Sequence, residues 1–187
     1  MRVIAGTAGG RVLESVPGDS TRPITDRVKS ALFSILASQE AIEGRRYLDL
    51  FGGTGAVGIE ALSRGALQVV FCERDRAALR TLRRNLEVTG TADRAVVVAG
   101  DAFRYLQQSE LTPFDVIYVA PPQYQGLWLR ALRAVDARPE ILTEEGQAIV
   151  QIYPKEWSEA ELVAIALLDS RRYGSTALHF FGRRARG

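Results

Sequence analysis

The segment that most restricts the fold of this chain is the glycine-rich run Asp49-Leu50-Phe51-Gly52-Gly53-Thr54-Gly55-Ala56-Val57-Gly58. A short apolar stretch over Tyr47–Phe51 precedes the glycines and is typical of a buried strand. The residues that follow, Ala56–Arg64, are typical of a helix. Glycines between a strand and a helix let the backbone turn sharply and approach a ligand closely. The run therefore predicts a nucleotide-binding turn at the edge of an α/β sheet.

Strand-like and helix-like patterns alternate after residue 46, which predicts a parallel sheet covered by helices on both faces. The expected strands are Tyr47–Phe51, Leu67–Cys72, Ala95–Ala99, Asp115–Val119 and Gln147–Tyr153. The expected helices are Ala56–Arg64, Arg76–Val88, Phe103–Gln107 and Leu127–Val135. Two further strand-like runs, Ala166–Tyr173 and Ser175–Gly182, meet at Gly174 and predict an antiparallel hairpin at the sheet edge.

The residues before this core divide into two regions. Residues 1–20 predict a small hairpin arm, because Gly6–Gly10 separates two short strand-like runs. Residues 21–45 hold a first helix, for which Thr25 is the expected N-cap. With 46–187 as the cofactor-binding and catalytic core, we expect residues 1–187 to form one domain.

Acidic residues at successive strand ends narrow the choice of nucleotide. Glu73 lies twenty residues after Gly53, where a carboxylate can accept both ribose hydroxyls of an adenosine. Gly53, Gly55 and Gly58 also satisfy the dinucleotide pattern G-x-G-x-x-G, so the glycines alone leave two cofactors open.

Three features favour S-adenosylmethionine over a dinucleotide. Asp49, in the strand before the glycines, is placed to hold the cofactor's ammonium group. Asp101 follows the third strand, where a carboxylate accepts from an adenine amino group, and the loop Ala120-Pro121-Pro122-Gln123-Tyr124 follows the fourth.

Composition argues against a membrane-spanning, disulfide-bonded or metal-binding protein, and the basic residues are concentrated near the C-terminal end of the sequence. The net charge is only +2, but the segment 171–187 has five arginines and no acid, a pattern that attracts phosphate. No apolar run approaches the ~18 residues of a membrane span, and the single Cys72 forms no internal disulfide. No Cys/His cluster accompanies His179. We therefore expect a cytoplasmic protein with neither a membrane nor a metal partner.

The motifs together resemble the RsmD-type family of bacterial 16S rRNA guanine-N2 methyltransferases over nearly the whole chain. The opening Met1–Gly6 and the segment Arg22-Pro23-Ile24-Thr25-Asp26-Arg27-Val28-Lys29 are similar to that family's signatures, and Asp49–Ala66 matches its glycine-rich stretch closely. The resemblance implies a Rossmann-like class I methyltransferase fold with a seven-stranded sheet and an N-terminal hairpin that contacts RNA. It also implies transfer of a methyl group to N2 of a guanine in small-subunit rRNA.

The catalytic loop departs from that family. The family's motif is [DN]-P-P-[FY], whereas this chain reads Ala120-Pro121-Pro122-Gln123, with an aromatic residue only at Tyr124. The Pro121 carbonyl is the expected acceptor for one N2 hydrogen. Ala120 has no side-chain acceptor for the other hydrogen, so water or another residue must accept it. Tyr124 is the expected stacking partner of the target base, with Trp128 as the next candidate.

The resemblance and the strand-end pattern give a set of expected site residues. The catalytic residues are Ala120, Pro121, Pro122 and Tyr124. The cofactor-binding residues are Asp49, Phe51, Gly52, Gly53, Thr54, Gly55, Glu73, Arg74, Asp101 and Ala102. The RNA-binding residues are Arg2, Arg11, Arg22, Arg27, Arg183 and Arg184, and the expected partner is 16S rRNA or the small ribosomal subunit, bound by a monomer.

Two other functions are compatible with the sequence. A catalytically impaired RNA-binding module of the same fold would bind rRNA without transferring a methyl group. An NAD(P)-dependent oxidoreductase would bind a dinucleotide at the same glycines.

Overall fold

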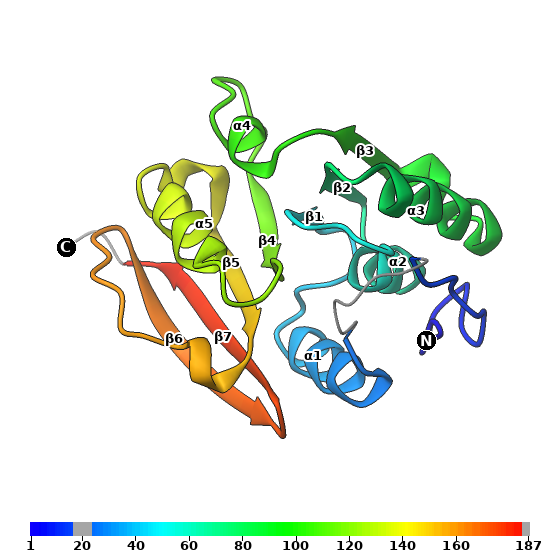
Figure 1. Cartoon of the computed structure of the whole chain (residues 1–187), viewed down its shortest axis with the longest axis horizontal. Coiled ribbons are helices and arrows are strands. Elements are labelled where there is room, and N and C mark those ends of the chain that lie inside the picture. The colour runs from blue at the N-terminus through cyan, green and yellow to red at the C-terminus, as the bar shows by residue number, and fades with distance from the viewer. Residues whose placement is uncertain (17–23, 185–187) are drawn as a thin grey trace.

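A computed structural model describes residues 1–16 and 24–184. Its centre is a seven-stranded sheet in the order β3-β2-β1-β4-β5-β7-β6, shown in Figure 1. The strands are β1 (Arg46–Asp49), β2 (Gln68–Glu73), β3 (Ala95–Ala99), β4 (Phe114–Val119), β5 (Leu142–Ile152), β6 (Ile165–Tyr173) and β7 (Thr176–Arg183). Strands β1 to β5 are parallel, and β7 runs antiparallel between β5 and β6. The mostly parallel sheet and its C-terminal antiparallel hairpin, both predicted from the sequence, are confirmed.

Helices cover both faces of the sheet, as the alternating pattern predicted. In Figure 1, α1 (Asp26–Ser38), α2 (Ala56–Ser63) and α3 (Arg76–Thr89) lie on one side. On the other side lie α4 (Ala102–Leu106) and α5 (Leu127–Asp136). Each face buries its own apolar cluster, one around Leu62 and Phe71 and the other around Ile117 and Trp128. Short 3-10 turns, Ala92–Arg94, Pro139–Ile141 and Pro154–Glu156, complete the described helical structure.

Polar side chains start three of the helices. The Thr25 hydroxyl accepts from the backbone N–H of Val28 at 3.3 Å, which confirms it as the N-cap of α1. Asp75 caps α3 and Asp101 caps α4 in the same way. Such a side-chain acceptor satisfies an amide that has no partner within its own helix.

Strand β5 is longer than the sequence pattern predicted. We expected Gln147–Tyr153, whereas β5 begins at Leu142. The additional residues include the exposed Glu144 and Glu145, and the pairing with β4 shifts register between Phe114 and Val116. An irregular, solvent-facing strand end carries no apolar alternation, so periodicity does not detect it.

The N-terminal arm forms a reduced version of the predicted hairpin. Arg2 and Val12 make a single antiparallel bridge, and the backbone N–H of Val3 donates to the Arg11 carbonyl at 2.9 Å. Residues 17–20, the remainder of the predicted arm, lie outside the described residues.

Within residues 1–16 and 24–184, no helix has both the length and the apolar character needed to cross a bilayer.

Candidate functional site

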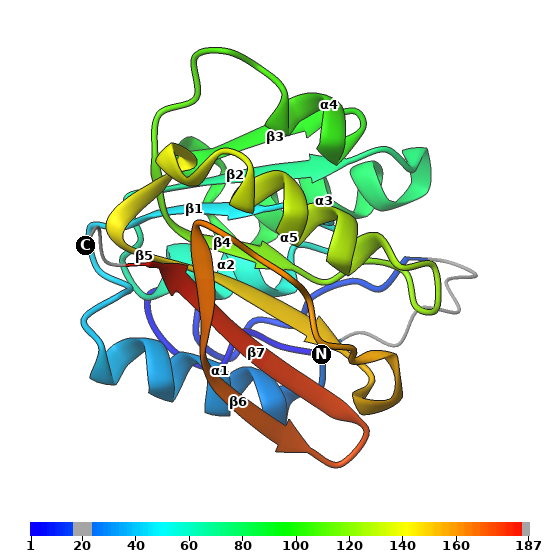
Figure 2. The same cartoon turned by 90° about the vertical axis from the view of Figure 1, so that its left-hand side faces the viewer.

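A cavity of about 1170 Å³ lies at the carboxyl ends of the parallel strands. Those ends point the same way in Figure 2, and ligands of open α/β sheets bind at this edge. Its lining includes the ends of β1, β2, β4 and β5, together with Gly100–Phe103 after β3 and Tyr173–Thr176 in the hairpin turn. The fold therefore brings together segments that the sequence separates by more than a hundred residues. Nearly all the predicted cofactor residues line it, namely Asp49, Phe51, Gly52, Gly53, Thr54, Glu73, Arg74, Asp101 and Ala102.

Gly55 is the one predicted cofactor residue that does not line the cavity. It adopts the left-handed conformation at φ +81°, and its backbone N–H donates to the Gly52 carbonyl at 2.7 Å. A Cβ atom added there would lie 2.5 Å from a methyl carbon of Leu82. Only glycine fits such a turn without strain, so Gly55 shapes the cavity without lining it.

Glu73 holds the glycine turn in place at the end of β2. One carboxylate oxygen accepts from the backbone N–H of Gly53 at 2.9 Å, and the other accepts from Arg74 and Asp75 at 2.8 and 2.7 Å. A carboxylate has about four acceptor positions. Glu73 therefore connects the turn after β1 to the turn after β2 and retains capacity for a ligand donor.

Asp49 is a buried acid with a missing partner. Its side chain lies at the end of β1 with 4% exposure, and one carboxylate oxygen, Oδ1, has no hydrogen-bond donor among the described residues. Burial raises the pKa of Asp49 to about 7, more than the backbone amides of Phe51 and Gly58 lower it. A buried acceptor without a donor is costly, and an ammonium group arriving from the cavity would satisfy it. The arrangement fits the amino group of S-adenosylmethionine.

The start of α4 lines the part of the cavity next to β3. One Asp101 oxygen accepts from the backbone amides of Phe103 and Arg104 at 2.9 and 3.0 Å. The Phe51 and Phe103 rings meet edge to face at 6.2 Å. The Arg130 guanidinium lies 3.7 Å above the Phe103 ring. Two apolar rings therefore lie near an acceptor, which are the kinds of group that can contact an adenine.

The loop after β4 is only partly in the cavity. Ala120, Pro121, Pro122 and Gln123 line it, but Tyr124 does not. Tyr124 has a left-handed backbone at φ +56°, and the residue is 68% exposed. Its ring stacks on Tyr153 with centroids 5.8 Å apart and planes 13° from parallel. The predicted base-stacking residue is thus at the mouth of the cavity and is itself stacked on an aromatic residue that lines it.

Trp128 does not serve as the alternative stacking residue. It is 3% exposed and stacks on Trp157 at 5.5 Å, while Trp157 stacks on His179 at 3.9 Å. The tryptophans are packing residues, and a base has no access to Trp128.

Several cavity residues were not identified from the sequence. Tyr118 and Gln151 come from β4 and β5, and their side chains are hydrogen-bonded at 2.5 Å. Tyr153 and Arg130 also line the cavity. Gln151 could have been noticed in the sequence, since it is a polar residue among the apolar residues at the end of this strand. The positions of Tyr153 and Arg130 depend on which elements become neighbours, which no local pattern reveals.

The predicted RNA-binding arginines separate into two groups. Arg27 belongs to the first turn of α1, and the backbone N–H of Arg2 donates to Asp26 in the same turn. The residues before this turn, Ile24 and Thr25, line the cavity. Arg22 lies outside the described residues.

The second group lies at the opposite edge of the sheet. Arg11 donates to the Val88 carbonyl in the last turn of α3, roughly 20 Å along that helix from its cavity end. Arg183 donates to the Leu142 carbonyl at the start of β5, roughly 30 Å along the strand from Ile152. Arg184 follows Arg183 and is exposed. RNA contact by these residues stays a prediction, and it would involve RNA far from the reacting base.

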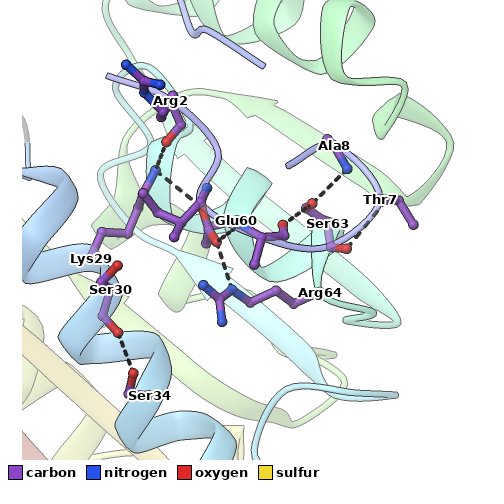
Figure 3. A network of polar contacts seen from close by, with 11 residues as sticks. Arg2, Thr7, Ala8, Lys29, Ser30, Ser34, Glu60, Ser63 and Arg64 are labelled. Carbon is purple, nitrogen blue, oxygen red and sulfur yellow. Dashed lines mark hydrogen bonds and ion pairs between the residues drawn. The ribbon is translucent and has the colours of Figure 1, made fainter. Parts of the chain in front are cut away.

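A buried ionic network attaches the N-terminal arm to α1 and α2. Lys29 of α1 and Glu60 of α2 are fully buried and paired at 3.3 Å, as Figure 3 shows. The Glu60 carboxylate also accepts from the backbone amides of Ile4 and Ala5, and Lys29 donates to the Arg2 carbonyl at 2.5 Å. This network links the arm, α1 and the helix that follows the glycine turn.

Comparisons with known proteins place this geometry in a class and then in a family. The fold and the strand-end cavity are those of a class I methyltransferase, the class that uses S-adenosylmethionine as methyl donor. The chain matches the family described as "Conserved hypothetical protein 95" over residues 1–182. It therefore belongs to this family, the RsmD-type methyltransferases, which confirms the resemblance seen in the sequence.

Individual relatives agree with that placement. The Bacillus subtilis protein named "Putative rRNA methyltransferase YlbH" is 37% identical over 187 residues, which span 98% of this chain and all of that protein. The Escherichia coli protein "Ribosomal RNA small subunit methyltransferase D" is 41% identical over 127 residues, 68% of this chain and 62% of that protein. The solved structure "Putative methyltransferase yhhF from Escherichia coli" has a TM-score of 0.85 and 33% identity, covering 100% of this chain and 99% of that one.

Proposed function

We propose that this protein transfers a methyl group from S-adenosylmethionine to the exocyclic N2 of a guanine in 16S rRNA. The observation that carries the proposal is the cavity at the strand ends, where Asp49, Glu73 and Asp101 face one space that also reaches the Ala120–Gln123 loop. The names of the Bacillus and Escherichia relatives support rRNA as the class of substrate. Family membership favours S-adenosylmethionine over a dinucleotide at the shared glycines.

The cavity residues divide between the two ends of the cofactor. Asp49, with its unpaired buried oxygen, would take the ammonium group. Glu73 would accept from the ribose, and Asp101 would accept from the adenine amino group while Phe51 and Phe103 contact its faces or edge. When bound there, the cofactor supplies an electrophilic methyl group on a sulfonium.

The loop after β4 would hold the target base. Pro121 and Pro122 restrict its backbone, so the Pro121 carbonyl is a fixed acceptor for one N2 hydrogen. Tyr124 would stack on the base with the ring face turned away from Tyr153, since the residue is largely exposed. Guanine N2 is a weak nucleophile because its lone pair is conjugated with the ring. Acceptors for its hydrogens let the nitrogen pyramidalise toward the methyl group.

Methyl transfer to defined ribosomal particles tests the proposal. Tritium transfer from labelled S-adenosylmethionine is measured with small subunits from a strain that lacks the protein, and the rRNA is then digested to nucleosides. We expect the label in N2-methylguanosine. Label in another nucleoside would contradict the assignment of the reacting atom. Binding of the subunits without transfer would instead support the catalytically impaired alternative.

A further inference from the structure

A polar pair on β4 and β5 lies beside the position where Ala120 lacks an acceptor. The β4–β5 register pairs Tyr118 with Ile149 and Val119 with Val150, so Ala120 follows beside Gln151. Tyr118 and Ile149 belong to the apolar cluster on one face of the sheet, and Ala120 packs against the same cluster. Val119, Val150 and Ile152 belong to the other. Strand alternation therefore puts the side chains of Tyr118, Ala120 and Gln151 on one face, and all three residues line the cavity.

The hydroxyl of Tyr118 fixes the orientation of the Gln151 amide. It donates to Gln151 Oε1 at 2.5 Å. Tyr118 is 4% exposed, and burial raises the pKa of its phenol well above the ordinary value, so the hydroxyl keeps its proton and remains a donor. A carboxamide oxygen has two lone pairs, and Tyr118 occupies one of them. The other remains available to a donor in the cavity.

We propose that the side-chain oxygen of Gln151 accepts one N2 hydrogen of the target guanine, replacing the acceptor that Ala120 does not provide. Tyr118 acts as the positioning residue that orients this oxygen. The inference rests on the proposed function, because it concerns an amino group as methyl acceptor. The side chain that accepts this hydrogen thus comes from β5 rather than from the loop after β4.

The chemical step balances without a protein base. The N2 lone pair forms the new C–N bond while the bond between sulfur and the methyl carbon breaks, and the bonding electron pair remains on sulfur. The methylated nitrogen then carries one proton more than the product, and this proton is released to water. Gln151 takes no proton; it holds one N–H so that the lone pair points at the methyl carbon.

Replacing Gln151 by Leu tests the proposal, because leucine is similar in size and has no acceptor. We expect Gln151→Leu to lower kcat on the order of a hundredfold, with binding of S-adenosylhomocysteine unchanged by calorimetry. Tyr118→Phe should lower kcat roughly two- to tenfold, as expected for one lost neutral hydrogen bond. Gln147→Leu is a matched control, since Gln147 is a buried glutamine of the same strand. Its side-chain amide donates to Gln39 Oε1, outside the cavity. That variant should keep the kcat of the unmodified protein.

A rescue experiment separates an acceptor from a merely structural role. Ala120→Asn introduces an acceptor at the neighbouring position, so we expect it to restore much of the kcat lost in Gln151→Leu. Wild-type kcat in Gln151→Leu would overturn the proposal, and so would a slow Gln151→Leu that Ala120→Asn does not rescue. Should Gln151→Leu fail to bind S-adenosylhomocysteine, Tyr118→Phe decides, and its unchanged kcat would overturn the proposal.

The two proposals fail in different experiments. If the unmodified protein forms no N2-methylguanosine, the proposed function is wrong. If it forms N2-methylguanosine and Gln151→Leu forms it equally fast, only the role of Gln151 is wrong.

Discussion

The Glu156 carboxylate accepts a hydrogen bond from the backbone N–H of Tyr124 at 2.7 Å, joining a turn after β5 to the loop after β4. Its other oxygen accepts from the backbone N–H of Tyr153 at 3.3 Å. One carboxylate therefore holds the backbones of the two stacked tyrosines. Because Tyr124 adopts a left-handed conformation, which is strained for a residue with a Cβ atom, its loop needs such a support.

Removing this support should slow catalysis without weakening cofactor binding. In Glu156→Ala we expect kcat to fall roughly tenfold, because Tyr124 loses its fixed position. In Tyr124→Ala we expect a larger loss of kcat, since stacking contributes about 1–3 kcal/mol per base. Tyr124→Phe keeps the ring and should have nearly the kcat of the unmodified protein. Methyl transfer and calorimetry with S-adenosylhomocysteine measure the two effects. Glu159→Ala, which changes a nearby exposed glutamate, is the control. A Tyr124→Ala variant as fast as the unmodified protein would show that the base stacks elsewhere.

Cofactor binding should strengthen as pH rises through 7, because of Asp49. Its pKa of about 7 means that the carboxyl is largely neutral at pH 6 and largely charged at pH 8. Only the charged form pairs with an ammonium group. We therefore expect the Kd for S-adenosylhomocysteine to fall about tenfold between pH 6 and 8, measured by calorimetry. Asp49→Asn should bind at least about tenfold more weakly at pH 8 and lose this pH dependence. An equally steep pH profile in Asp49→Asn would assign it to another group.

The same substitution should stabilise the ligand-free fold. The pKa of Asp49 is raised from the ordinary value of 3.8, so the folded state favours the protonated acid. Its contribution to stability is complete below pH 3.8 and is lost as pH rises through about 7. We expect Asp49→Asn to raise the free energy of unfolding at pH 8 by an amount on the order of 1–3 kcal/mol. The increase in this free energy should be smaller at pH 5. Urea unfolding at both pH values measures this difference, with Asp93→Asn on the exposed surface as the control. Equal gains at the two pH values would be inconsistent with a buried ionisation.

Glu73 should affect both the cofactor and the glycine turn. Glu73→Ala removes the acceptor of the Gly53 amide as well as the proposed ribose acceptor, so we expect at least tenfold weaker cofactor binding and a lower melting temperature. Glu73→Gln keeps one side-chain oxygen and should be intermediate. Glu87→Ala, an exposed glutamate of α3, provides the control. Calorimetry and thermal unfolding measure the two effects, and unchanged affinity in Glu73→Ala would exclude Glu73 from the cofactor site.

The Lys29–Glu60 pair should be essential for stability. Lys29→Met leaves the buried Glu60 carboxylate without its buried cation, although Arg64 still contacts it at 2.7 Å. We expect the free energy of unfolding to fall by about 3–5 kcal/mol, measured by urea denaturation. Adding Glu60→Gln should recover part of the loss, since the unpaired charge disappears. Arg84→Met breaks exposed ion pairs and should change stability by less than about 1 kcal/mol. If Lys29→Met alone were as stable as the unmodified protein, the pair would not be essential for stability.

Much of the sheet could be predicted because its signals are local. Apolar runs predicted β1 to β4, and Thr25 before an apolar helical pattern predicted the N-cap of α1. Asp101 was predicted only as an adenine acceptor, and its role as the N-cap of α4 emerged from the structure. The early start of β5 was missed because Glu144 and Glu145 face solvent beyond a register shift and carry no alternating pattern. The single-domain organisation and the monomeric state stay predictions.

The sequence by itself determined where the predicted cofactor residues would meet. Asp49 and Glu73 end β1 and β2, and Asp101 follows β3. The carboxyl ends of parallel strands necessarily lie at one edge of the sheet. The tertiary structure alone decided which side chains face each other across that edge. The pairing of β4 with β5 put Gln151 beside Ala120, and a turn after β5 put Tyr153 and Glu156 against Tyr124. Strand order and register arise from packing of the whole core, so no local pattern encodes these contacts.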